Sequence, residues 1–298
     1  MLEKINNYIT MVFTEDGFTY SNCVLVDDDI RVLIDSGAGS IMPQVYPEHI
    51  DMVLNSHHHI DHVRGNNLCT EAKILMHPLE QASMDSLEEL TATTGWEELM
   101  NDGGMLGSAA MSGLIEELGG PWRIDGTIND GDVIDCGHTE IMVMHTPGHS
   151  KGHCSFYFPE QELFFLGDIC LSKVGPWYGN ETCSIEEFID SINRIIALRP
   201  RMVTAGHVNR VITTDVKQTL LEYRDRILKR EQRILRYLQT HSSNIDELAQ
   251  QHLIYRQHPT PFVLFWEKYM IKKHLERLVD IGYVEPLDDG SFQGIKIG

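Results

Sequence analysis

The chain has 298 residues, of which 42% are hydrophobic and 23% are charged. This balance is typical of a globular protein with a sizeable core and excludes a disordered or fibrous chain. Acidic residues outnumber basic ones by 44 to 24, so the net charge opposes contact with nucleic acid or anionic membranes. No apolar run reaches the roughly 20 residues that a membrane span needs, and no secretory signal is recognisable. We therefore expect a cytoplasmic protein without membrane contact.

The charge is unevenly divided along the chain. Acidic residues outnumber basic ones by 32 to 11 in residues 1–212, whereas residues 213–298 are close to neutral. Because the length also allows two domains, this change predicts a catalytic domain over residues 1–212 and a separate tail over residues 213–298.

Short β-rich runs in the first part each end in a turn or a polar cluster, as strands that feed loops do. These runs are 30–35, 52–55, 140–145, 163–166 and 202–205. Helices are expected between them, because apolar residues recur on one face over residues 185–198. The sequence therefore predicts a mixed α/β structure with polar residues gathered at strand ends.

Residues 78–122 differ from their surroundings, because they are rich in Met, Gly and Glu. We expect a helical insertion here. Its methionines favour ordinary helix packing, and an adaptable cap over an apolar substrate is the alternative. The methionines concerned are Met84, Met100, Met105 and Met111.

The tail has the pattern of three helices and a hairpin. An amphipathic connector helix begins near Thr213, and two further helices are expected over residues 244–251 and 263–281. Short strands at 283–285 and 292–297 follow. This order predicts a winged-helix-like domain that packs on the catalytic domain or forms a homodimer.

The strongest chemical signal is the segment 55–62, Asn-Ser-His-His-His-Ile-Asp-His, which follows a short apolar strand. Imidazole nitrogens and a carboxylate at this density suit a divalent transition metal. A solvated polar loop is the alternative. His149, Asp168 and His207 also follow predicted strands, which favours a metal site.

Taken in order, these motifs resemble those of the metallo-β-lactamase superfamily over about residues 1–212. The matching motifs are His57-x-His59-x-Asp61-His62, Thr146-Pro-Gly-His149, Gly167-Asp168 and Gly206-His207, with Asp35 at the superfamily's first motif. The resemblance implies an αββα sandwich, in the α/β (α+β) class, with the site at one edge of the sheets.

The same resemblance assigns the ligands of two divalent metal ions. It implies that His57, His59 and His149 hold one ion, that Asp61, His62 and His207 hold the other, and that Asp168 bridges them. Zinc is the expected metal, and iron or manganese suits the same nitrogen and oxygen ligands. A hydroxide shared by the two ions would then attack the substrate, with Asp61 orienting it or accepting a proton.

The site resembles that of glyoxalase II enzymes, and the tail resembles one attached to a subgroup that includes thioesterases and an endoribonuclease. We therefore expect a hydrolase of a small acyl substrate, either a thioester or an ester or lactone. An endoribonuclease or other phosphodiesterase is the alternative, although the acidic charge opposes nucleic acid. A non-catalytic, metal-stabilised binding module is the hypothesis from another class.

The segment 172–180 follows the bridging aspartate and is rich in glycine and aromatic residues. We expect it to overhang the metals. Tyr178 is a candidate catalytic residue that would donate a hydrogen bond to a developing oxyanion, and packing is the alternative role. His153 is expected to orient a ligand rather than to bind metal.

Overall fold

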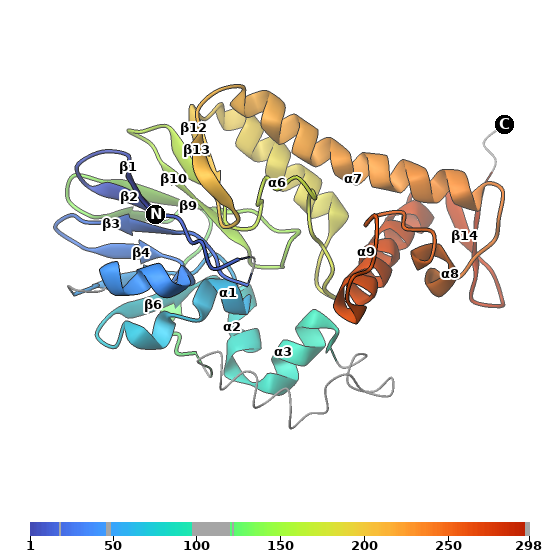
Figure 1. Ribbon diagram of the computed structural model, residues 1–298, viewed down its shortest axis with the longest axis horizontal. Helices are drawn as coiled ribbons and strands as arrows, with labels where there is room; N and C mark the ends of the chain where they lie inside the picture. Colours follow the sequence, from blue (N-terminus) through green and yellow to red (C-terminus); the bar gives the residue numbers. More distant parts are fainter. Residues whose placement is uncertain (18, 46–48, 97–119, 121, 296–298) are drawn as a thin grey trace.

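The computed structural model describes residues 1–17, 19–45, 49–96, 120 and 122–295. Two β-sheets lie face to face, with helices on both outer sides (Figure 1). This is the predicted αββα sandwich. The described residues contain no helix that combines the length and the apolar character needed to cross a lipid bilayer.

The first sheet has seven strands that are neighbours in chain order. Strands β1 to β4 are antiparallel and β4 to β7 are parallel. The strands are β1 (Leu2–Lys4), β2 (Ile9–Val12), β3 (Cys23–Val26), β4 (Val32–Ile34), β5 (Met52–Leu54), β6 (Lys73–Met76) and β7 (Gly126–Thr127).

The second sheet has six strands in the order β13-β12-β11-β10-β9-β8. All neighbours are antiparallel except β11 and β12. The strands are β8 (Val133–Asp135), β9 (Glu140–His145), β10 (Cys154–Phe158), β11 (Leu163–Phe165), β12 (Met202–Ala205) and β13 (Val208–Ile212).

The period-two pattern of the strands decides what each face buries. In β11, Leu163 and Phe165 join the core between the sheets, whereas Phe164 packs on the outer side. The outer side of the second sheet is covered by α6 (Ile185–Leu198), which begins and ends at the predicted residues. The first sheet carries on its outer side the short 3₁₀ helix η1 (Gly39–Gln44).

Short helices follow the first-sheet strands. Helix α1 (Ile60–Val63) lies in the histidine-rich segment, and the 3₁₀ helix η2 (Asn66–Leu68) comes soon after it. The predicted insertion begins with α2 (Pro78–Asp85) and α3 (Leu87–Thr94). Met84 is buried there, whereas the insertion's other methionines, Met100, Met105 and Met111, lie outside the described residues. The substrate-cap role of the insertion stays a prediction.

The tail contains α7 (Val216–Leu238), α8 (Ile245–Ala249), α9 (Pro261–Asp280) and the antiparallel strands β14 (Val284–Pro286) and β15 (Phe292–Gly294). Helix α7 runs from the sandwich to the far end of the molecule (Figure 1). Its apolar face joins the hydrophobic cluster that also contains α6, α9 and the outer side of the second sheet. The elements follow the predicted order, and the winged-helix and domain-boundary interpretations stay predictions.

Candidate metal centre

The seven predicted ligands come together where strands of both sheets end. They follow β5, β9, β11 and β12, and the segments after these strands carry all of them, with Asp61 and His62 in the short helix α1. Two groups are apparent, and in each of them one ligand atom per residue lies within 4.8 Å of the others. Group one is His57, His59 and His149, group two is Asp61, His62 and His207, and Asp168 lies between them.

Group one consists of three imidazoles whose nitrogens converge. His149 Nε2 lies 3.2 Å from His57 Nε2 and 2.9 Å from His59 Nδ1. Burial, assisted by the neighbouring imidazoles, lowers the pKa of His57 and His59 well below the usual value. Metal ions bind neutral imidazole. Group one is therefore a set of neutral nitrogen donors directed at one point.

Group two combines two imidazoles with a carboxylate. Asp61 Oδ2 lies 3.1 Å from His207 Nε2 and 3.6 Å from His62 Nε2. The side chains of Asp61 and His207 are 21% and 20% exposed, whereas His62 is fully buried. Group two is therefore the part of the centre that faces solvent.

Asp168 presents a different oxygen to each group. Its Oδ2 lies 3.3 Å from His149 Nε2, whereas its Oδ1 lies 3.1 Å from His62 Nε2 and 3.2 Å from His207 Nε2. His62 Nε2 and Asp168 Oδ1 are both buried, and in the described part of the chain they contact charged neighbours without making a hydrogen bond of regular geometry. Buried polar atoms without partners are costly, and a shared cation would satisfy both.

The negative charge of the carboxylates at the site also favours a bound cation. Burial by itself would lower the pKa of His62, but three neighbouring carboxylates, that of Asp168 first, raise it to about 10. Without a metal ion, the carboxylates therefore hold a proton on His62. A divalent cation would replace that proton and supply the positive charge. The donor set and its electrostatics thus fit two divalent metal ions.

In His57, His59, His62 and His149, the ring nitrogen that faces away from the centre has a partner that fixes the ring. His57 Nδ1 lies 2.9 Å from Ser56 Oγ, and His62 Nδ1 lies 2.7 Å from Asp35 Oδ2. Asp35 also accepts the backbone N–H of Ser56 at 2.8 Å. Its φ of +57° is left-handed, a conformation that aspartate tolerates. The predicted Asp35 therefore supports the ligands without belonging to either group.

The loop 172–180 supplies the partners of the other two imidazoles of group one, those of His149 and His59. His149 Nδ1 donates to the carbonyl of Trp177 at 3.0 Å. The side-chain amide of Asn180 lies 2.8 Å from His59 Nε2. Rotating the Asn180 amide by 180° exchanges its oxygen and nitrogen, so that the oxygen can accept a hydrogen bond from His59 Nε2–H. The other ring nitrogen, Nδ1, then carries no proton and can bind a metal. Asn180 gave no signal in the sequence, because its contact spans 121 residues.

The hydroxyl of Tyr178 does not face the metal centre, where the oxyanion role would require it. Its side chain is fully buried, and its hydroxyl lies 2.8 Å from His274 Nε2 and accepts a hydrogen bond from Arg230 at 3.2 Å. These partners belong to α9 and α7 of the tail. The hydroxyl therefore joins the loop to the tail, and this placement corrects the oxyanion role expected for it.

Two other residues hold the ligand loops in place. His153 Nε2 accepts the backbone N–H of Asp168 at 2.9 Å, and its Nδ1 donates to the Thr146 carbonyl at 3.0 Å. Burial lowers the pKa of His153 to about 3, which keeps it neutral for this role. Glu80 of α2 accepts the backbone N–H groups of His58 and Gly152. Its contacts span 22 and 72 residues, and no sequence pattern indicated them.

A cavity of about 240 Å³ lies against group two. Its lining includes His207 together with Thr14, Glu15, Gly17, Tyr20, Gly206 and Asn209. Besides His207, Glu15 and Tyr20 are the ionisable side chains among these residues, so the wall carries negative rather than positive charge. The cavity therefore borders the candidate metal centre at His207.

The sequence pattern of the metallo-beta-lactamase superfamily matches residues 16–207. Similar curated proteins are the hydroxyacylglutathione hydrolases of Rhodospirillum rubrum, 33% identical over 160 residues, and of Cereibacter sphaeroides, 29% identical over 161 residues. The alignments cover 53% of this chain and 48% and 49% of those proteins. The chain thus spans about half the length of these relatives.

Two solved structures resemble the chain over almost its whole length. A metallo-beta-lactamase family protein from Thermus thermophilus has a TM-score of 0.77 at 21% identity, covering 98% of this chain and 100% of that one. A beta-lactamase domain protein from Burkholderia ambifaria has a TM-score of 0.74 at 16% identity, covering 99% and 93%. At these identities the likeness shows the fold, and it extends through the tail.

Proposed function

The chain belongs to the metallo-β-lactamase superfamily. We propose that it is a metal-dependent hydrolase that uses two divalent ions to cleave a small acyl substrate. The bond cleaved would be a thioester or an ester, lactones included. The observation that carries the proposal is the placement of Asp168, whose two oxygens face different groups. A carboxylate placed between two ligand groups is able to serve an ion in each of them.

The residues of the chain would have different roles at such a site. Two divalent ions held together lower the pKa of a shared water, so that a hydroxide is available near neutral pH. His57, His59 and His149 would hold one ion, and Asp61, His62 and His207 the other. Asp61 is partly exposed and lies 3.1 Å from His207, which lines the cavity. This position suits the proposed role of orienting the attacking group or accepting its proton. Zinc is the proposed metal, and iron and manganese suit the same ligands.

The cavity beside group two supports a small substrate without high negative charge. Its volume of about 240 Å³ suits a small acyl group, and its lining contains the carboxylate of Glu15. The net charge of −20 acts in the same direction, because it repels a polyanion such as RNA. The name of the relatives, hydroxyacylglutathione hydrolase, supports an acyl–sulfur bond. A cytoplasmic location and a homodimer remain predictions.

Turnover of a substrate panel tests this proposal. The protein is purified without chelator and assayed with acyl thioesters, esters, lactones, phosphodiesters and single-stranded RNA, and Asp168→Asn serves as the inactive control. We expect thioester or lactone hydrolysis that a chelator abolishes and Zn²⁺ restores. Cleavage of RNA or phosphodiesters alone would replace the proposal with the endonuclease alternative. No metal-dependent turnover of any substrate would contradict both.

A further inference from the structure

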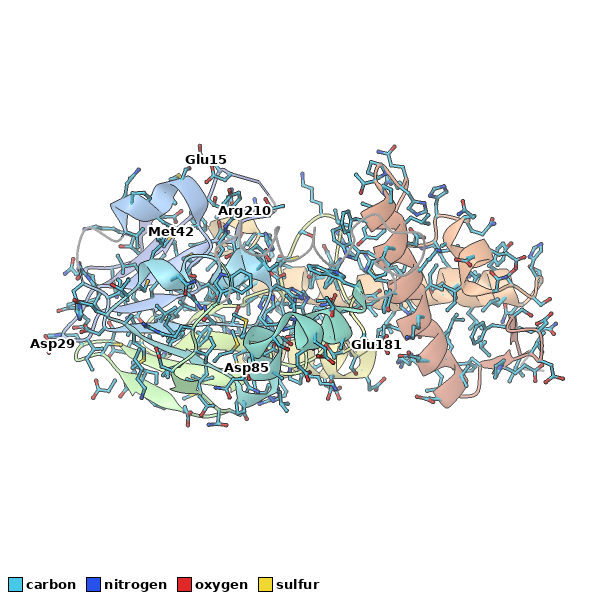
Figure 2. All side chains as sticks on the ribbon, turned by 90° about the horizontal axis from the view of Figure 1, so that it is seen from below. Glu15, Asp29, Met42, Asp85, Glu181 and Arg210 are labelled. Carbon is cyan, nitrogen blue, oxygen red and sulfur yellow. The ribbon has the colours of Figure 1, made fainter. Side chains whose placement is uncertain are left out.

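The loop 172–180 connects the metal centre to the tail. On its inner side, Trp177 and Asn180 contact two imidazoles of group one. At its end, Glu181 lies between the sandwich and α9 (Figure 2), where its carbonyl accepts a hydrogen bond from Lys273 at 2.7 Å. Whatever fixes this loop therefore also fixes His59 and His149.

Two arginines of α7 bind the outer side of the same loop. Arg230 donates to the carbonyls of Pro176 at 2.5 Å and Val174 at 2.8 Å. Arg226, one turn earlier, donates to the carbonyls of Ser172, at 3.3 Å, and Lys173. Four carbonyls of one short loop are thus held by a single helix of the tail. We call Arg226 and Arg230 the arginine clamp.

Arg230 is unusual because its guanidinium is buried. The residue is 2% exposed, and a buried charge is stable only when oriented polar groups surround it. The two carbonyls and the Tyr178 hydroxyl supply that environment. The planar guanidinium can hold several acceptors in fixed directions, which a lysine ammonium does less well. Arg230 and the loop therefore fix each other's position.

The sequence of the loop accommodates this close approach at Gly175. A Cβ at this position would lie 3.0 Å from Arg226 Cδ and 3.1 Å from Arg230 Nη2, and its φ is +100°. Glycine adopts this conformation readily and leaves room for both arginines. The loop is thus shaped to be held by α7.

We propose that Arg226 and Arg230 are positioning residues for the metal ion of group one. They act through the loop, which sets the rings of His59 and His149, and they bind no metal themselves. Group two takes its support from elsewhere, because Asp35 bonds His62 and Ser21 bonds the Asp61 carbonyl. The inference rests on the proposed two-metal site and predicts that the clamp affects one ion only.

Zinc titration of the full chain tests the clamp. The protein is stripped of metal and titrated with Zn²⁺ by calorimetry, and bound metal is counted by elemental analysis. In Arg230→Met we expect one of two sites to weaken by roughly 10–100-fold, the usual effect of losing support behind a ligand, while the other changes less than about twofold. Arg233→Met is the matched control, because Arg233 is exposed on the same helix and its Nε bonds the Lys229 carbonyl. It should titrate like the wild type.

Other results would overturn the proposal in recognisable ways. Two unchanged sites in Arg230→Met, or an equal loss at both sites, would mean that the clamp serves stability alone. If Arg230→Met does not fold, the partly exposed Arg226 provides the second variant, Arg226→Met, with the same criteria. A wild-type protein that binds fewer than two ions would instead contradict the proposed dinuclear site, so the two failures are distinguishable.

Discussion

The two halves of the metal centre are supported by different parts of the molecule. Group two is held from within the sandwich: Asp35, directly after β4, bonds His62, and Ser21 donates to the Asp61 carbonyl at 2.9 Å. Group one depends in addition on segments outside the sandwich. The loop 172–180, bound by the tail, holds His59 and His149.

The insertion contributes to group one as well. Glu80 of α2 accepts hydrogen bonds from two backbone N–H groups. That of His58 lies in the segment of His57 and His59, and that of Gly152 lies in the loop of His149. The difference between the groups teaches that the sandwich alone supports the proposed site of group two. The proposed site of group one is also held by elements added to the sandwich. Variants that act on one group, on both or on neither can therefore test this division.

The largest effect is expected from Asp168→Asn, because Asp168 serves both groups. The amide lacks the charge that two cations require, so both ions should bind more weakly. Activity should fall by at least the roughly 10²–10³-fold that loss of one transition-state contact costs. Steady-state kinetics and elemental analysis measure the two effects, with the exposed Asp190→Asn as control. A variant that keeps full activity would contradict the bridging role.

Asp35→Asn should weaken group two most and so mirror the arginine-clamp variants. A smaller effect on group one is expected, because Asp35 also bonds Ser56, the partner of His57. Asparagine tolerates the left-handed φ of +57° at this position, but it loses the carboxylate that holds His62 Nδ1 at 2.7 Å. We expect roughly 10–100-fold weaker Zn²⁺ binding at one site. Combined with Arg230→Met, both sites should weaken. If the double variant weakens only one site, the two residues act on the same group.

Glu80→Gln tests the contribution of the insertion through stability and its pH dependence. Burial would raise the pKa of Glu80, but the electrostatic interaction with His58 and hydrogen bonds to the carboxylate lower it to about 2. The stabilisation is therefore complete above the unfolded pKa of about 4.3 and is lost as the pH falls toward 2. We expect Glu80→Gln to lose on the order of 2 kcal/mol at pH 7 and less at about pH 3.

Chemical denaturation at both pH values measures this difference. Glu88→Gln is the control, because Glu88 is exposed on the neighbouring helix α3. An equal loss of stability under the neutral and the acidic condition would mean that the ionised form of Glu80 makes no special contribution.

The smallest effect is expected at the surface of the junction between sandwich and tail. Arg277 Nε lies 2.7 Å from Glu186 Oε2, but the Glu186 side chain is 64% exposed. Exposed ion pairs contribute about 0.5 kcal/mol, so Glu186→Gln should lower the Tm by about 1–2 °C. Zn²⁺ binding should not change. A marked loss of either metal ion would show that the whole junction, and not the arginine clamp, supports group one.

The candidate ligands could be identified in the sequence because each motif lies just after a predicted strand. The spacing of His57, His59, Asp61 and His62 is local, and Asp168 and His207 each follow a glycine at a strand end. Several strands and α6 could be predicted for a similar reason, because β-rich runs and helical periodicity are local patterns. The αββα arrangement followed from the family resemblance. The division of the ligands into groups followed from the resemblance.

The supporting residues could not be predicted, because their contacts join distant segments. Arg230 lies 54 residues from Pro176, and Glu80 lies 72 residues from Gly152. Both resemble ordinary helix residues in the sequence. Tyr178 was misassigned for the same reason, since the direction of its hydroxyl depends on α7 and α9. Local patterns identify which residues can bind metal, whereas tertiary packing decides what holds them.

The metal content of the wild-type chain tests the central claim most directly. Elemental analysis of protein purified without chelator, together with Zn²⁺ titration of the stripped protein, gives the number of ions per chain. The bridging placement of Asp168 between the two groups predicts two ions per chain, with zinc as the expected element. A stoichiometry of one or none after titration with excess Zn²⁺ would contradict the two-group site.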